Sequence, residues 1–148
     1  DKQLTSVVTA PVKPNKIMIA GLNDPTDYEK DFISNNNINT CSPEEIKSDS
    51  DKITNWIKSE KITHLAIHFD LDVLNYHNFR SLLFANPEAD ENTYAGVGKG
   101  KLEISEAIKL INETNNHTEI VGIGIAEHLP WDAINLKHML SKLPLLND

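Results

Sequence analysis

Two aspartates, Asp70 and Asp72, follow the apolar run "HLAIHF" and are separated by one residue. In an extended segment, residues two apart point to the same side, so we expect both carboxylates to face one cavity. Two close negative charges repel, which would push one carboxyl toward protonation. A divalent cation removes that conflict, and carboxylate oxygens suit Mg²⁺ or Mn²⁺. The pair is a candidate metal site; the open alternative is that one aspartate ends the strand and the other caps a turn.

Other side chains near these aspartates are candidates for supporting roles. His68 shares the parity of Asp70, so it is either a ligand or neighbour of the metal or a histidine satisfied in the core. Glu127 ends a second apolar run, "EIVGIGIA", and is followed directly by His128. Glu127 is therefore a candidate binding residue or simply the residue at the end of a strand, and His128 is a candidate neighbour of it.

Apolar and amphipathic segments alternate along the chain. We expect strands at 17–21, 64–69 and 119–127. We expect helices at 24–36, 42–46, 51–60, 105–116 and 131–143, with N-caps at Asp24, Ser42, Ser105 and Asp132. This alternation predicts an α/β fold with a parallel sheet flanked by helices on both faces. Ligands of such sheets bind beyond the carboxyl ends of the strands, which is where Asp70, Asp72 and Glu127 fall.

Two stretches show no periodic pattern. Residues 1–14 are expected to be an extended lead-in, and residues 75–100 a long loop. Long loops in compact domains are commonly functional or mobile, and residues 86–100 are candidates for ligand contacts, together with His128 and Trp131.

Composition narrows the classes of partner. The 148 residues carry a net charge of −8, which argues against a nucleic-acid or acidic-membrane partner. A single cysteine, Cys41, allows no internal disulfide and is typical of a reducing cytoplasm. No apolar stretch approaches membrane-spanning length. A cytoplasmic protein is expected.

Four segments in order resemble the arginase/agmatinase (ureohydrolase) family. "HLAIHFDLDVLN" resembles its motif F-D-x-D-x-x-D-P, and "EIVGIGIAEHLPWD" resembles the strand that ends in its substrate-binding glutamate. "PNKIMIAGLNDPTDYEKDFISNNNI" and "GKGKLEISEAIKLINE" resemble the elements that precede and separate these two. The resemblance runs from about Pro14 to the end and covers only the carboxyl-terminal half of the family domain.

The resemblance implies a three-layer α/β/α sandwich and two Mn²⁺ ions that activate water for attack on a guanidinium or related carbon. Asp70 and Asp72 match two metal-ligating aspartates of the family, and Glu127 matches the carboxylate that pairs with the substrate. A small guanidino or formimino substrate and a homo-oligomer are the expected partners. The missing amino-terminal half is a third expected partner, because the family's other metal ligands lie there.

The chain departs from the family in two ways. Asn75 and Tyr76 replace the D-P of the motif, which would alter the turn. The G-G-[DN]-H and D-[AI]-H-x-D motifs and the proton-transfer histidine are absent, so no catalytic residue is assigned and the isolated chain is expected to be inactive.

Two other functions stay open. The first is a haloacid-dehalogenase-like Mg²⁺-dependent phosphatase, which also places D-x-D after a buried strand, although Leu74 stands where that family has Thr or Val. The second is a non-catalytic binding or assembly domain that keeps the fold without the chemistry.

Overall fold

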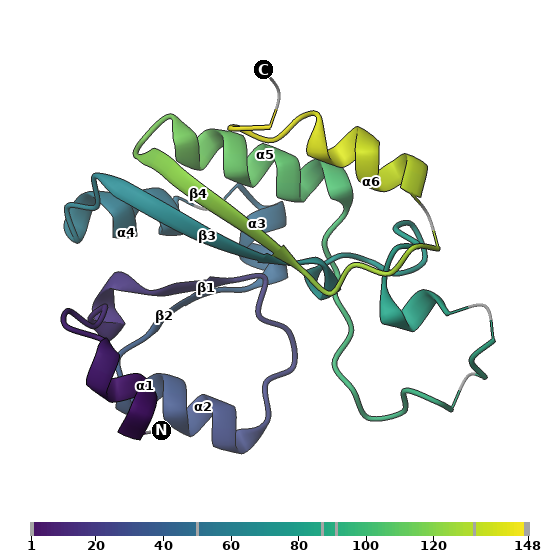
Figure 1. The fold of residues 1–148 in the computed structure, drawn as a ribbon, viewed down its shortest axis with the longest axis horizontal. Helices are drawn as coiled ribbons and strands as arrows, with labels where there is room; N and C mark the ends of the chain where they lie inside the picture. Colours follow the sequence, from purple (N-terminus) through teal and green to yellow (C-terminus); the bar gives the residue numbers. More distant parts are fainter. Residues whose placement is uncertain (1, 50, 87, 91, 132, 147–148) are drawn as a thin grey trace.

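The computed structural model describes residues 2–49, 51–86, 88–90, 92–131 and 133–146. Within these ranges the strands are β1 (Met18–Ala20), β2 (Asn39–Cys41), β3 (His64–Asp70) and β4 (Glu119–Ala126). The α-helices are α1 (Lys2–Val7), α2 (Asp27–Asn35), α3 (Pro43–Lys47), α4 (Lys52–Ser59), α5 (Ile104–Asn115) and α6 (Ala133–Leu140). Short 3₁₀ helices are Pro14–Lys16, Leu71–Val73 and Leu83–Ala85. Figure 1 shows how these elements follow one another.

Local sequence explains where several helices begin. Ser42 caps α3 through a capping box, in which its side chain accepts from the N–H of Glu45 at 3.2 Å and its own N–H donates to the Glu45 carboxylate at 2.7 Å. The predicted Ser42 cap is confirmed. The predicted Asp24 cap is wrong, because Asp24 lies in a turn with φ of 47° and Thr26 caps α2 instead.

The two other predicted helix caps are Ser105 and Asp132, and the structure also bears on the predicted lead-in. The cap of α5 is Glu103 and not Ser105, because the capping box forms between Glu103 and Glu106. The predicted cap Asp132 lies outside the described residues. The expected extended lead-in is also corrected, because Lys2–Val7 form α1.

The strands pair in parallel, as the alternation predicts, but in two separate two-stranded sheets. In one sheet Met18 lies opposite Asn39, and in the other Asp70 lies opposite Ala126. Within the described residues each strand therefore has one partner and one edge without a partner. The α/β class with parallel strands is confirmed.

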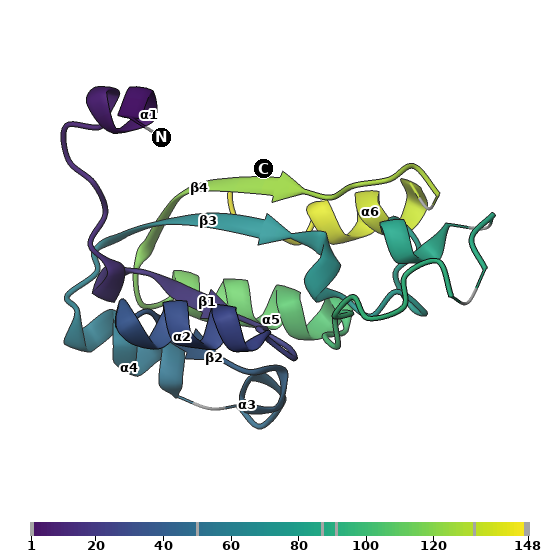
Figure 2. The ribbon, with the colours of Figure 1, turned by 90° about the horizontal axis from the view of Figure 1, so that it is seen from below.

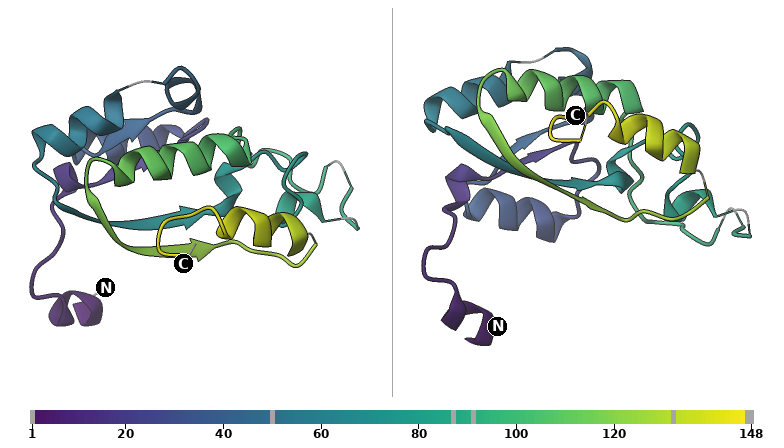
Figure 3. Two further views of the ribbon diagram at one scale, coloured as in Figure 1. Left: turned by 90° about the horizontal axis from the view of Figure 1, so that it is seen from above. Right: turned by 45° about the horizontal axis from the view of Figure 1, so that its top comes forward.

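Helices cover the two sheets unequally. α2 and α4 lie on opposite sides of the β1–β2 sheet (Figure 1). α5 and α6 lie along one face of the β3–β4 sheet, and no helix of the described chain lies on its other face (Figures 2 and 3). Along β3, exposed side chains on the open face alternate with partly or fully buried side chains on the helix-covered face. The exposed ones are His64, Ala66, His68 and Asp70. A parallel sheet with an open face is unusual, since such sheets are normally covered on both sides.

The core lies between the β3–β4 sheet, α5, α6 and the segment after β3, and it extends to buried side chains of β2, α3 and α4. Its largest fully buried side chains are Phe79, Leu71, Leu74, Leu82, Leu102, Met139 and Leu143. Two of these, Phe79 and Leu82, belong to the predicted long loop 75–100, so the start of that loop is firmly packed. No helix in the described residues is long and apolar enough to cross a membrane.

Candidate metal and substrate site

The aspartate pair lies where β3 gives way to a 3₁₀ helix. β3 ends at Asp70, and Asp72 is already within the helix Leu71–Val73. The N–H of Asp72 donates to Oδ1 of Asp70 at 2.9 Å, so Asp70 caps this turn. The expected extended geometry of the pair is therefore wrong. The buried side chain of Leu71, which is 0% exposed, holds the turn in the core.

The expected charge conflict is nevertheless present at Asp72. Burial, and then the negative charges of Asp70 and Glu127, raise the pKa of Asp72 to about 6. Oδ1 of Asp72 is buried and has no hydrogen-bond partner. An orphaned carboxylate oxygen beside two other carboxylates lacks a positive partner, which is the environment that a divalent cation would satisfy.

The donor set is incomplete within the described chain. No group of three or more His, Cys, Asp or Glu side chains there is arranged to hold a metal ion. The carboxylates of Asp70 and Asp72 fit a hard divalent cation chemically, but further ligands would have to come from elsewhere. Asp70 and Asp72 therefore stay candidate ligands, and the described residues do not complete a metal site around them.

Glu127 follows β4 directly and has an uncommon backbone conformation. Its φ is 62°, in the left-handed region, which costs a non-glycine residue of order 1–3 kcal/mol. We expected a buried strand to hold this carboxylate in place; in the structure β4 is only partly buried and the side chain of Glu127 is exposed. The backbone just after Glu127 is held in place more firmly than the Glu127 side chain, because the N–H of Leu129 donates to the carbonyl of Ser81 at 2.9 Å.

His68 and His128, the candidate neighbours of the aspartates and of Glu127, both lie toward the carboxyl ends of β3 and β4. His68 is exposed on the open face of β3, the face that also carries Asp70. His128 is exposed next to Glu127. Supporting roles for both histidines stay predictions.

A groove near Asp72 was not expected from the sequence. It has a volume of about 490 Å³, and its residues come from the loop after β1, from the end of α3, from the loop after the 3₁₀ helix Leu71–Val73 and from the segment before α5. They are Asn23, Asp24, Lys47, Asn75, Tyr76, His77, Val97, Gly98, Lys99, Gly100 and Lys101. The signal in the sequence was "GVGKGK", which combines lysines with glycines inside the predicted loop.

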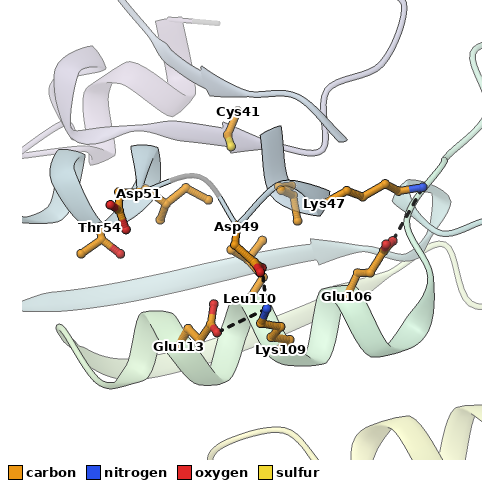
Figure 4. Close-up of a pocket in the computed structure, with 11 residues that line it drawn as sticks. Cys41, Lys47, Asp49, Asp51, Thr54, Glu106, Lys109, Leu110 and Glu113 are labelled. Atoms are coloured by element: carbon orange, nitrogen blue, oxygen red, sulfur yellow. Dashed lines mark hydrogen bonds and ion pairs between the residues drawn. The ribbon is translucent and has the colours of Figure 1, made fainter. Parts of the chain in front are cut away.

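A second, smaller cavity of about 190 Å³ lies between α3, α4 and α5 (Figure 4). In this cavity Lys109 pairs with Asp49, whereas its contact with Glu113 and the contact of Lys47 with Glu106 are long, each at 3.8 Å. Cys41 also lines it, and burial, followed by the charge of Glu45, raises the pKa of its thiol. A protonated, buried thiol is a poor nucleophile, so nothing about Cys41 marks it as reactive.

Comparisons with known proteins bear on the fold. No protein-family model matches the chain, and no curated protein matches its sequence. Solved structures do match. Entamoeba histolytica arginase in complex with L-ornithine aligns with a TM-score of 0.65 and 19% identity, over 97% of this chain and 47% of that one.

Two further solved structures match this chain over a similar share of its length. Helicobacter pylori arginase aligns with a TM-score of 0.64 and 17% identity, over 86% of this chain and 42% of that one. Bacillus subtilis formimidoylglutamase aligns with a TM-score of 0.62 and 16% identity, over 88% of this chain and 40% of that one. The chain spans less than half the length of each of these proteins. It has the fold of part of an arginase-like domain.

Proposed function

We propose that this chain is part of a Mn²⁺-dependent hydrolase that cleaves a C–N bond of a guanidinium or related amidine group. The observation that carries the proposal is the buried, unpartnered oxygen of Asp72 beside the carboxylates of Asp70 and Glu127. The arginase-like fold supports it, since the neighbours with this fold are arginases and a formimidoylglutamase.

Each carboxylate has a distinct role in this proposal. Asp70 and Asp72 would hold Mn²⁺, and Asp70 also orients Asp72 through the hydrogen bond to its N–H. When bound, two such ions would supply a nucleophile from water at neutral pH and stabilise the negative charge that develops. Glu127 would pair with the planar guanidinium of the substrate, because a carboxylate matches its geometry. The exposed Glu127 side chain is free to meet a ligand.

The remainder of the site would come from the rest of the complete protein. The unpaired strand edges and the open face of β3–β4 support this proposal, because an uncovered parallel sheet favours a further layer. A missing amino-terminal half is the proposed occupant, and assembly as a homo-oligomer is a further proposal. The 148-residue chain alone is expected to release no urea.

Metal uptake by the complete protein tests the proposal. Replacing both Asp70 and Asp72 by Ala should abolish stoichiometric Mn²⁺ binding, measured by elemental analysis after dialysis. A matched double variant, Asp27→Ala with Asp31→Ala, changes exposed carboxylates on α2 and should retain metal. Unchanged metal content in the first variant would refute the assignment.

The same preparation separates the alternatives. Hydrolysis of guanidino or formimino compounds with Mn²⁺ supports the proposal, and Mg²⁺-dependent release of phosphate from phosphate esters would support the phosphatase. Neither activity, in a protein that is folded and complete, would favour the binding or assembly domain.

A further inference from the structure

We propose that the groove beside Asp72 binds an anionic group, a carboxylate or a phosphate, carried by the substrate, with Lys99 as its main contact. This inference rests on the proposed function, because only that function makes the bound anion part of a substrate. It would make the protein selective for guanidino or formimino compounds whose far end is an acid, against those whose far end is an amine.

Charge in the groove is the first support. Lys47, Lys99 and Lys101 line it with one carboxylate, Asp24, so the lining residues carry three positive charges and one negative charge. The whole chain, by contrast, carries a net charge of −8. A local excess of positive charge in an acidic protein attracts small anions to that place.

Lys99 is held in position without a carboxylate partner. Its Nζ lies 4.9 Å from the centre of the Tyr76 ring, within the range of a cation–π contact. The Tyr76 ring in turn packs on the ring of His77, with centres 4.0 Å apart. Within the described residues no ion pair is formed by Lys99. A positioned ammonium of this kind can bind an anion at a small cost in side-chain entropy.

The other lysines are only weakly engaged. Nζ of Lys101 lies 4.0 Å from Asp24 and 3.7 Å from Glu44, and Nζ of Lys47 lies 3.8 Å from Glu106. These separations are long for charge-assisted hydrogen bonds, and exposed ion pairs contribute little. Both ammonium groups therefore remain able to add to the attraction of an anion next to Lys99.

The backbone joins the groove to the proposed metal site. The N–H of Leu102 donates to the carbonyl of Val73 at 3.1 Å, and the N–H of Asn75 donates to the carbonyl of Leu102 at 2.8 Å. A Cβ on Gly100 would lie 2.2 Å from the carbonyl oxygen of Asp72, so only glycine permits this close approach. The amide of Asn23 holds the segment from its other side by donating to the carbonyl of Lys99 at 2.9 Å.

Binding of simple anions tests the groove independently of catalysis. The complete protein, freed of metal with a chelator, is titrated with glutarate and with inorganic phosphate and followed by isothermal calorimetry. We expect Lys99→Gln to weaken the binding of the preferred anion about tenfold, the scale of one lost charged hydrogen bond, and Lys99→Arg to retain most of it. Lys142→Gln, an exposed lysine beyond α6, is the matched control and should change nothing.

Steady-state kinetics test the link to the substrate. For an ω-guanidino acid, Lys99→Gln should raise KM about tenfold with little change in kcat, whereas KM for the corresponding ω-guanidino amine should not rise. No anion binding, equal binding by wild type and Lys99→Gln, or an equal rise in KM for both substrates would overturn the inference. If no guanidino or formimino compound is hydrolysed, the proposed function fails, and the calorimetric result still decides whether the groove binds anions.

Discussion

Replacing Asp72 by Asn should stabilise the metal-free chain at neutral pH. The substitution keeps the shape of the side chain and removes the charge that burial, Asp70 and Glu127 disfavour. The rise in the pKa of Asp72 from 3.8 to about 6 corresponds to about 3 kcal/mol at about 1.4 kcal/mol per unit. Because the residue is only half-buried, solvent screening reduces this, and we expect a gain of about 1.5 kcal/mol.

The gain should depend on pH in a defined direction. The pKa of Asp72 is higher in the folded chain than in the unfolded chain, so the folded chain binds the proton more tightly. The penalty from the charged form is complete above pH of about 6, decreases as the pH falls, and is absent below the unfolded value of 3.8. The stabilisation by Asn should therefore be much smaller at about pH 4.5 than at about pH 7.5.

Urea unfolding with a chelator present measures this effect. The fluorescence of Trp56, which is 6% exposed, and far-ultraviolet circular dichroism report the transition. Asp31→Asn, at an exposed position of α2, controls for the general loss of a negative charge. If Asp72→Asn is no more stable than wild type at pH about 7.5, or if its gain is unchanged at pH about 4.5, the charge conflict at Asp72 is not real.

Three further changes have expected outcomes. Gly100→Ala should destabilise the chain by at least about 2 kcal/mol in urea unfolding, since its Cβ would overlap the backbone of Asp72, whereas Gly122→Ala, with open space around the new Cβ, should be nearly neutral. Ser42→Ala should cost about 1 kcal/mol by the same measurement because it removes the cap of α3, and a neutral result would contradict the capping box. In the complete protein, Glu127→Gln should lower kcat/KM by about tenfold to a hundredfold through a lost charged hydrogen bond of about 1.5–3 kcal/mol, with unchanged Mn²⁺ content; loss of Mn²⁺ instead would place Glu127 in the metal site.

Hydrophobic patterning alone was enough to predict the main elements. The apolar runs at 64–69 and 119–127 became β3 and β4, and the periodic segments became helices close to the expected bounds. Strand β2 was missed, because three residues containing Asn and Thr have no readable alternation. Its existence depends on pairing with β1, which is a tertiary interaction.

Side-chain types and spacing made Asp70, Asp72 and Glu127 candidate site residues and predicted that all three lie at strand ends; their roles stay predictions. Only the tertiary structure decided their geometry. Leu71 is buried in the core, and Asp72 lies in the 3₁₀ helix after β3, where one of its carboxylate oxygens is buried without a hydrogen-bond partner. No local pattern predicts this, because it depends on what packs around Leu71.

For the groove with Lys99, too, the sequence shows which residue types are present and the tertiary structure decides where they lie. The sequence displays lysines and glycines in a stretch without periodicity, and such a stretch has no predictable partner. Its position against Asp72 and Tyr76 follows from the fit of Gly100 on the backbone and from hydrogen bonds to residues far apart in the sequence. Residue types thus determined which chemistry is available to this protein, whereas long-range packing decided which of these groups meet.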